Sequence, residues 1–512
     1  MSCSLEHDDP NFLSESGWRE YWDLEGTGLY CHNRRFRRVG LQFPDDLLVD
    51  APKVVKSLQE EIDNLASLHG RDFSCQVYLM ADTSYNPSCV DEVAAAHANA
   101  DAIVHYGPAC MCPLSRLPAR YVFGRKPLCA DSVARALAEI WRGASSRGSV
   151  ALVVFTDQVF VEHVGKVEQE LSTLLPDQAP AVVFARIAGV EAEPASELAA
   201  ACSAGSEDPE HAAAGFRWTL PEGVAMADCE AAWVGPPGSD AKRHLQLTHS
   251  LMRWSAVDPG GGPGSEVAVA EGVPPEVPRL LRRRYFLVEK AREAAIVGLL
   301  VGTLGVAGYR SAIAAVRGLT ERAGKTCYMF LVGKPSPAKL ANFPEIEVFM
   351  MVGCPQGLVL DSKEYYAPVI TPHEAYIAFT GRDWDPGSYR LDFADLLRPE
   401  GPEQQAEQRD PRMSFMSGGT RLVCQPEEGG GGARPSQADA NLVLAERPQD
   451  TAVVAAQKSS GALQVVSAAE YLSYRRGYKG LETPATGAPL KPVEKAVEGM
   501  KGRAAGYAAE PH

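Results

Sequence analysis

The sequence is dominated by a regular alternation between short apolar runs and segments whose apolar residues recur every three or four positions. The run RRVGLQF at residues 37–43 is followed by VKSLQEEIDNLASL at 55–68, and the same order returns further along the chain. A short apolar run followed by an amphipathic segment predicts a strand followed by a helix. Repeated units of this kind predict parallel strands joined by right-handed crossovers. We therefore expect an α/β fold.

The alternation restarts twice, which predicts three related Rossmann-like modules with parallel sheets. We place the first module at residues 36–125, the second at 126–278 and the third at 279–398. They resemble one another in the order of their elements more than in residue identity. A chain of 512 residues is also too long for one ordinary core.

Several regions look unlike the modules. Residues 1–35 form an N-terminal extension, and residues 399–512 are expected to be a flexible linker and a partly disordered C-terminal tail because they lack apolar periodicity. Inside the second module, residues 191–215 and 257–278 are rich in small residues, glycine and proline. This composition predicts surface insertions or linkers that carry no chemistry.

The charge and the first residues of the chain indicate its surroundings. The chain has 50 basic and 65 acidic residues, and its net charge of -15 disfavours nucleic acid and anionic membranes as partners. The opening MSCSLEHDDP lacks the basic start and apolar stretch of a secretory signal, and no stretch reaches the roughly 18 apolar residues of a membrane helix. We expect a cytoplasmic protein, in which the 12 cysteines are reduced thiols, core residues or metal ligands.

Three cysteines follow predicted strand ends. Cys89 comes after the strand YLMAD, Cys110 after AIVHYG, and Cys354 directly after VFMMVG. The carboxyl ends of parallel strands form the edge at which α/β proteins bind ligands. We therefore expect these three thiols to be functional. The other cysteines begin a strand or helix, lie inside a strand, or belong to the insertions and termini, and we interpret them as structural or incidental.

Spacing alone leaves the chemistry of this group open. Three protein thiolates on a [4Fe-4S] cluster would leave one iron free for another ligand, and zinc accepts the same thiolates in a tetrahedral site. A third interpretation is that Cys110 and Cys112, spaced C-x-C, are ordinary loop cysteines. If a metal binds, Cys112 competes with Cys110 as the third ligand.

Two other features have simpler interpretations. The segment VGTLGVAG at residues 301–308 lacks the glycine order of a dinucleotide fingerprint and the lysine of a phosphate loop, so we expect a tight turn between strand and helix. His105 lies inside a predicted strand and is expected to be a core residue. No arrangement typical of hydrolases stands out.

The sequence resembles the diphthamide biosynthesis protein 1/protein 2 family of 3-amino-3-carboxypropyl transferases, which act on translation elongation factor 2. The resemblance runs from about Phe36 to Pro372 outside the insertions. It is carried by the segments ADTSYNPSCVDEVAAAHANADAIVHYGPAC and GKPSPAKLANFPEIEVFMMVGCPQG, with support from VGLQFPDDLL, RRRYFLVEKAR, VGLLVGTLGVA and GYKGLETP.

The resemblance implies three α/β modules around a central [4Fe-4S] cluster. In catalytic members each module contributes one cysteine, and the open iron binds S-adenosylmethionine. Here the loop after AVVFARIAG in the middle module has no cysteine. This departure fits the second, non-catalytic subunit, in which residues corresponding to Cys89, Cys110 and Cys354 would hold the cluster.

The resemblance also implies the protein's role and partners. The chain would be the accessory electron-transfer subunit of a heterodimer, helping to reduce the cluster of its catalytic partner, diphthamide biosynthesis protein 1. The electron donor would be diphthamide biosynthesis protein 3, and elongation factor 2 would be the substrate of the complex. The alternatives are a cluster-free scaffold that stabilises the partner and, less in keeping with the missing cysteine, a competent homodimer.

Overall fold

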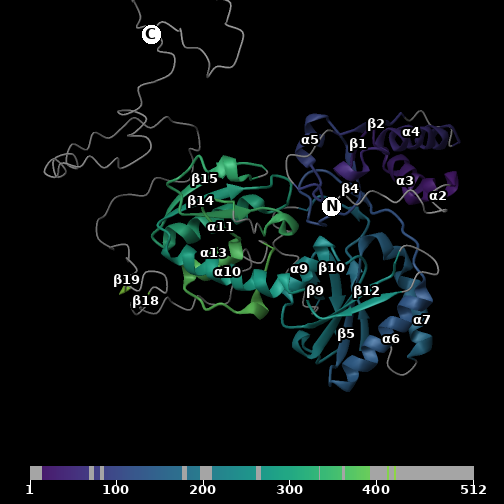
Figure 1. Cartoon of the computed structure of the whole chain (residues 1–512). Coiled ribbons are helices and arrows are strands. Elements are labelled where there is room, and N and C mark those ends of the chain that lie inside the picture. Colours follow the sequence, from purple (N-terminus) through teal and green to yellow (C-terminus); the bar gives the residue numbers. More distant parts are fainter. Residues whose placement is uncertain are drawn as a thin grey trace, which may run out of the picture. The chain divides into compact units, whose positions relative to one another are not determined.

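The protein is described here from a computed structural model (Figure 1). The structure describes residues 14–68, 74–80, 86–175, 181–195, 210–260, 267–333, 335–359, 364–392, 412–413 and 420–421. The expectation of a disordered tail lies outside these residues, apart from the short strands β18 (Arg412–Met413) and β19 (Thr420–Arg421), which pair with each other. Cys3, Cys202 and Cys424 also lie outside them.

The first sheet contains the parallel strands β1 (Arg38–Gln42), β2 (Gln76–Leu79), β3 (Ala102–Tyr106) and β4 (Ala119–Val122). Their spatial order is β2-β1-β3-β4, and the short strand β8 (Glu191–Ala192) pairs antiparallel with β4. Helix α4 (Ala51–Leu68) packs on this sheet through residues at a helical spacing, Val54, Leu58 and Ile62. Helix α5 (Glu92–His97) lies between β2 and β3 in the sequence.

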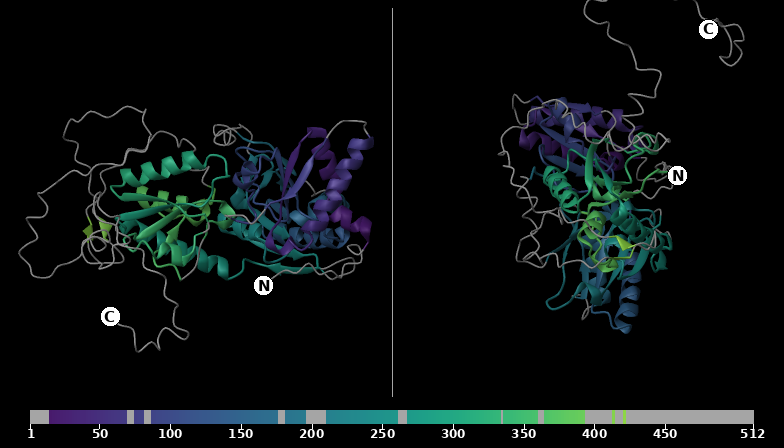
Figure 2. Two further views of the ribbon diagram at one scale, coloured as in Figure 1. Left: turned by 90° about the horizontal axis from the view of Figure 1, so that it is seen from above. Right: turned by 90° about the vertical axis from the view of Figure 1, so that its left-hand side faces the viewer.

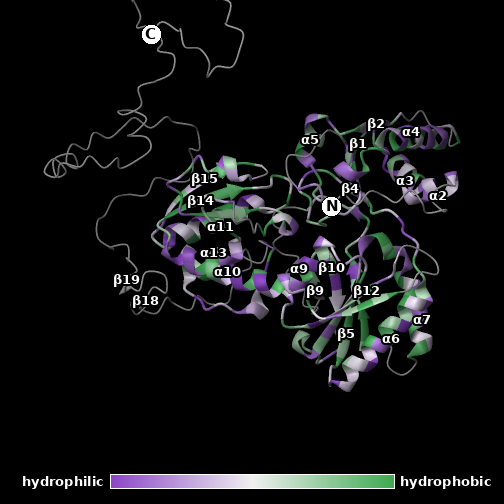
Figure 3. Cartoon of the chain, in the orientation of Figure 1, coloured by the Kyte–Doolittle hydropathy of each residue, from purple (hydrophilic) through white to green (hydrophobic). Residues whose placement is uncertain are grey.

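The second sheet has the same arrangement. Its parallel strands are β5 (Ala151–Thr156), β6 (Val182–Phe184), β11 (Cys229–Val234) and β12 (Arg253–Asp258), in the order β6-β5-β11-β12. Helices α6 (Ala130–Ser146) and α7 (Val164–Leu174) pack on it, and α9 (Asp240–Thr248) follows β11. The strands are mostly hydrophobic, whereas α6 and α7 mix hydrophobic and hydrophilic residues (Figure 3).

The third sheet contains β14 (Ile296–Val301), β15 (Thr326–Leu331), β16 (Val348–Val352) and β17 (Val369–Ile370), all parallel, in the order β15-β14-β16-β17. The strands lie side by side in both further views (Figure 2). Helices α10 (Glu276–Glu293), α11 (Tyr309–Arg322) and α13 (Pro372–Thr380) share one core with it.

The three sheets therefore repeat one topology. In each, the first strand in sequence lies between the second and the third, and the fourth pairs beside the third. The predicted α/β class and its threefold repetition are confirmed. The predicted turn between strand and helix at residues 301–308 is also confirmed, with β14 before it and α11 after it. The boundaries that we assigned to the modules remain a prediction.

The prediction for the two insertions was partly wrong. Residues expected to be linkers form β9 (Glu210–Ala213), which pairs with β10 (Phe216–Thr219), and β13 (Ala268–Glu271), which pairs with β12. Backbone pairing needs no particular side chain, so a stretch of small residues can complete a sheet edge despite its composition. The hairpin of β9 and β10 also reaches the candidate site described below.

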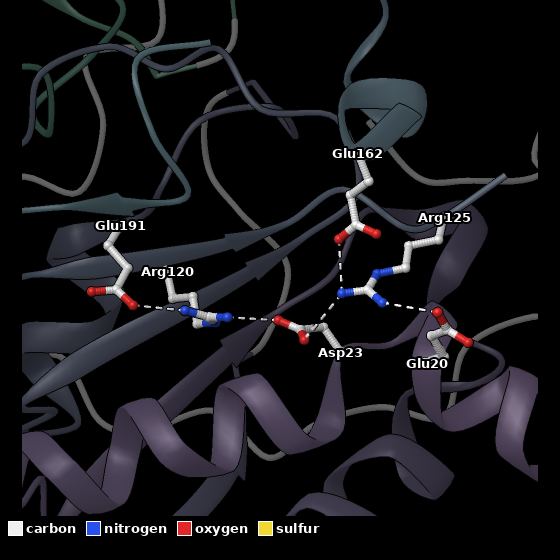
Figure 4. A network of polar contacts seen from close by, with 6 residues as sticks. All are labelled: Glu20, Asp23, Arg120, Arg125, Glu162 and Glu191. Atoms are coloured by element: carbon white, nitrogen blue, oxygen red, sulfur yellow. Dashed lines mark hydrogen bonds and ion pairs between the residues drawn. The ribbon is translucent and has the colours of Figure 1, made fainter. Parts of the chain in front are cut away.

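The N-terminal helices belong to the core of the first sheet. Helices α2 (Glu15–Tyr21) and α3 (Leu24–Arg34) bury Trp18, Trp22 and Leu24 against it. An ionic network connects them to β4, β8 and the 3-10 helix after β5 (Figure 4). It consists of Glu20, Asp23, Arg120, Arg125, Glu162 and Glu191, with nitrogen–oxygen distances of 2.7–3.6 Å.

Within the described residues, no helix is both long enough and apolar enough to cross a membrane.

Candidate metal centre

Three cysteines from two sheets meet in one buried group. Cys89 lies between β2 and α5, Cys110 follows β3, and Cys354 follows β16. Their Sγ atoms all lie within 4.8 Å of one another, and each residue is less than 10 % exposed. The structure thus brings together the three residues that the sequence placed at strand ends. Residues 89 and 354 are 265 positions apart in the chain, and only the tertiary fold joins them.

Local hydrogen bonds shape the first two cysteine loops. The Asn86 side chain accepts a bond from the Ser88 backbone N–H at 2.9 Å, and the Asn86 carbonyl accepts one from the Cys89 N–H at 2.9 Å. This turn is a typical use of asparagine, whose side chain replaces a backbone acceptor. The Cys110 N–H donates to the Ser88 carbonyl at 2.8 Å. The two loops therefore hold each other in place.

Two buried glutamines fix the same loops from neighbouring strand ends. Gln42, the last residue of β1, donates to the Cys89 carbonyl at 2.6 Å and accepts from the Asp91 N–H at 2.9 Å. Gln158 follows β5 of the second sheet and bonds both backbone groups of Ala109, at 2.8 and 2.7 Å. Each side-chain amide thus donates to one backbone carbonyl and accepts from one backbone N–H, as a neighbouring strand would. The second sheet contributes an amide at the edge where the other two contribute thiols.

The first and third sheets are joined beside the thiols. The Ala307 N–H donates to the Pro113 carbonyl at 2.8 Å, and Leu114 and Val306 form an isolated antiparallel bridge. Gly357 lets the Cys354 loop approach Asn86, because a Cβ atom at Gly357 would lie 2.6 Å from the Asn86 Nδ2 atom. These contacts bring the Cys354 loop to the Cys89 loop.

Cys112 is a fourth thiol at the same place. Its Sγ atom lies 3.9 Å from the Sγ atom of Cys354, and it is only partly buried. The sequence left open whether Cys110 or Cys112 joins the group. Cys110 lies within the compact set of three, and Cys112 lies beside it.

The acidic residues of the site already have partners. Glu92, which is fully buried, accepts bonds from the backbone N–H groups of Ser115, Arg116 and Leu117 and from the Ser115 hydroxyl. Asp91 accepts from the Ala94 N–H and caps α5. Both carboxylates therefore stabilise loops, and the thiols are the donor atoms left for a metal.

The thiols hydrogen-bond one another, with Cys110 as the acceptor and its neighbours as donors. The S–H groups of Cys112, Cys354 and Cys89 lower the pKa of Cys110 well below its usual value. The same contacts, with burial, raise the pKa of Cys89 and of Cys112. The group can therefore hold one thiolate easily. Additional buried thiolates would require a compensating positive charge.

The residues described around the cavity beside the thiols provide no such charge. In the described part of the chain, the cavity is lined by thiols, the two bonded carboxylates and mostly apolar residues, without lysine or arginine. A buried set of soft donors without a cation from the protein fits an iron–sulfur cluster or zinc. Neither hard cations nor phosphate groups would suit this donor set.

The glycine segment 301–308 has a larger part in the site than its sequence indicated. It forms the expected turn between β14 and α11, but Thr303, Gly305 and Val306 also line the cavity. A Cβ atom at Gly305 would lie 3.2 Å from the Val90 carbonyl oxygen, so a side chain there would crowd the segment after Cys89. Its position at a strand end was the available indication of this role.

His105 and several other cysteines are core residues. His105 is fully buried, its Nε2 atom lies 3.1 Å from the Pro108 carbonyl oxygen, and burial lowers its pKa. Cys31 and Cys75 are buried in the first core, where their thiols hydrogen-bond. Cys229 begins β11 and is also buried.

These features define a class: an α/β protein of three like sheets with a buried thiol centre at strand ends. The sequence profile of the family described as "Putative diphthamide synthesis protein" matches residues 43–390. Relatives agree with this match over nearly the whole chain. The chain belongs to the diphthamide synthesis family.

Two vertebrate relatives and one yeast relative illustrate the similarity. Each is named 2-(3-amino-3-carboxypropyl)histidine synthase subunit 2. The Gallus gallus protein is 34% identical over 95% of this chain and 92% of its own length, and the Xenopus laevis protein is 35% identical over the same shares. The Schizosaccharomyces pombe protein is 32% identical over 78% of this chain and 74% of its own length.

A solved structure, that of Dph2 from Pyrococcus horikoshii with a 4Fe-4S cluster, covers 72% of this chain and 92% of its own length with a TM-score of 0.48 and 17% identity. Similarity at this level is too distant to transfer any chemistry.

Proposed function

We propose that this chain is the accessory iron–sulfur subunit of a heterodimeric 3-amino-3-carboxypropyl transferase, which modifies a histidine of translation elongation factor 2 with S-adenosylmethionine. Cys89, Cys110 and Cys354 hold a [4Fe-4S] cluster in this proposal. The partner is a catalytic subunit of the same family, and a separate protein donates electrons. The membership of the family and the names of the relatives support the pathway and the subunit.

One observation carries the cluster assignment. Three sulfur atoms from distant parts of the chain gather within 4.8 Å in a buried place, and the described residues that line the adjoining cavity include no lysine or arginine. Ordinary core cysteines would need no such convergence, and the desolvation of several thiolates would be costly without a metal. Iron would provide the missing positive charge, and the thiolates would exclude water from it.

The surroundings of the site support the accessory role. The bound cluster would supply one-electron reduction. Gln42, Gln158 and Glu92 hold the thiol loops through hydrogen bonds between their side chains and backbone groups. The cavity is narrow and mostly apolar, and its lining residues, as far as the structure describes them, include no basic group to bind the carboxylate of S-adenosylmethionine. This arrangement favours electron relay to the partner over chemistry at this subunit.

Iron analysis and spectroscopy under anaerobic conditions test the proposal. The full chain should purify brown, with about four irons per chain, and Cys89→Ser and Cys354→Ser should each lower the iron content and the brown absorbance. Cys129→Ser is the matched control, because Cys129 begins α6 away from the group. Unchanged iron content in both ligand variants would refute the assignment.

The role is tested by electron transfer. The reduced full chain, mixed with the oxidised catalytic subunit, should lose its paramagnetic signal as the signal of the partner appears. A chain without iron that still supports modification by the partner would instead establish the alternative, a cluster-free scaffold.

A further inference from the structure

The C-x-C segment carries more structure than a three-ligand site requires. Cys110 and Cys112 flank Met111, whose φ angle of 56° lies in the left-handed region. A methionine pays a conformational penalty there, since only glycine and a few short polar residues adopt it readily. Such outliers persist where the surroundings impose them, and they gather at functional sites.

The strained turn brings the thiols of Cys110 and Cys112 to the same buried group of cysteines. If Met111 were extended, the side chains of residues 110 and 112 would lie on the same face but further apart along the chain. In the observed turn Cys110 is part of the set of three, and the Cys112 Sγ atom lies 3.9 Å from the Cys354 Sγ atom. Both cysteines line the same cavity.

Elements on either side hold this turn. Gly215, in the hairpin between β9 and β10, lies so close to Met111 that a Cβ atom at Gly215 would be 2.5 Å from the Met111 Cβ atom. On the other side, the buried Glu92 fixes the backbone of Ser115, Arg116 and Leu117, and the Ala307 N–H holds the Pro113 carbonyl. The position of Cys112 is therefore set by contacts before and after it.

We propose that the Cys112 thiolate is a fourth protein ligand of the cluster, which closes the iron that three ligands would leave open. This inference rests on the proposed function and deepens it. A cluster with four thiolates offers no vacant iron for a substrate, so it can relay electrons but cannot bind S-adenosylmethionine. On binding, Cys112 loses its proton to solvent and its sulfur bonds iron, with no change in oxidation state.

Paramagnetic resonance of the anaerobically reconstituted full chain tests this inference, with S-adenosylmethionine as the probe. We compare the dithionite-reduced wild type, Cys112→Ala, Cys112→Ser and the control Cys129→Ala, and measure iron, sulfide and circular dichroism for each. The wild-type and Cys129→Ala spectra should not respond to S-adenosylmethionine. Cys112→Ala should keep its iron on the three remaining thiolates, show a shifted spectrum, and shift again when the probe is added.

The outcomes separate the two proposals. A Cys112→Ala protein that folds but loses iron, while Cys129→Ala keeps it, also supports ligation, and Cys112→Ser should then retain more iron because its hydroxyl can ligate weakly. A wild-type spectrum that responds to the probe, or a Cys112→Ala spectrum identical to that of the wild type, overturns the fourth ligand while the cluster stands. A wild type without iron overturns the proposed function itself.

Discussion

Two buried polar centres in the described part of the chain differ in where their compensating charge comes from. In the third core, Arg284 and Glu374 form a fully buried ion pair. Glu374 also accepts from the Tyr389 hydroxyl at 2.7 Å and the Thr371 N–H at 2.8 Å, and the Arg284 guanidinium donates to the Val369 carbonyl at 3.0 Å. Every charge there has a partner within the chain.

The thiol centre has the opposite character. Its sulfur atoms hydrogen-bond one another, and its carboxylates are engaged by the backbone, but the described residues lining its cavity include no cation. A buried centre that balances its own charge is complete within the fold, and removal of one partner leaves a costly unpaired charge. One that does not balance it requires something from outside the chain, which is why we assign function to the thiols and a structural role to the ion pair.

The largest expected effect is on the self-balanced centre. Glu374→Ala leaves the Arg284 guanidinium buried and unpaired, so the free energy of unfolding should fall by about 3–5 kcal/mol, measured by urea denaturation. The control is Glu321→Ala, which breaks an exposed pair with Arg317 on α11 and should cost less than about 1 kcal/mol. Equal losses of unfolding free energy in the two variants would show that the buried pair contributes no more to stability than an exposed one.

The next effect concerns the glutamine that supports the thiol centre. Gln158→Leu leaves two buried backbone groups of Ala109 unpaired, and we expect a loss of about 2–3 kcal/mol together with a lower iron content and a changed paramagnetic spectrum. Gln158→Glu keeps the hydrogen-bond acceptor but loses the donor, so its stability and iron content should lie between those of Gln158→Leu and the wild type. The exposed Gln169 on α7 provides the control, Gln169→Leu. An unaltered spectrum in Gln158→Leu would mean that this residue only packs.

The response to pH extends the comparison. Burial lowers the pKa of His244, His249 and His373 to about 4, and His373 packs against Tyr389 of the self-balanced centre. Between about pH 6.5 and 4 the unfolded chain binds more protons than the folded one, so stability is complete above pH 6.5 and falls as the pH is lowered through this window. Each histidine contributes up to about 1.4 kcal/mol per pH unit.

Denaturation series at several pH values measure this slope. His373→Phe should reduce it, since the variant has no proton to gain at that position. A slope unchanged by this substitution, or a stability that rises on acidification, would contradict the assignment of buried neutral histidines.

The smallest effect should come from the thiols in the absence of metal. In iron-free protein, Cys354→Ser should change the free energy of unfolding by about 1 kcal/mol, because the serine hydroxyl can still donate a hydrogen bond to the Cys110 sulfur. In iron-loaded protein the same substitution should remove the stabilisation that binding provides. Equal changes with and without iron would show that the thiol centre is structural, like the ion pair.

Much of this organisation could be predicted from the sequence. The alternation of apolar runs and helical periodicity predicted the three parallel sheets, because both patterns are local. Cys89, Cys110 and Cys354 could be selected because each follows a strand, and parallel strands end at one edge. Trp18 and Trp22, four residues apart, were an available indication that α2 packs into the core, which we did not use.

Other parts of the site could not be predicted. Gln158 has no ligand chemistry, and its partner Ala109 lies 49 positions away. The turn between β9 and β10, which contains Gly215, lies in a stretch whose composition resembles a linker. Its role depends on close backbone approach to Met111, which no residue pattern encodes.

The sequence by itself determined the fold class, the repeated order of the strands and the three cysteines at their ends, since these depend on periodicity and on the nature of each residue. Only the tertiary structure decided that the sulfur atoms share one buried place, that Cys112 lies beside them, and that the described residues lining their cavity include no cation. Distances between residues hundreds of positions apart arise from the packing of whole sheets, and local patterns do not specify that packing.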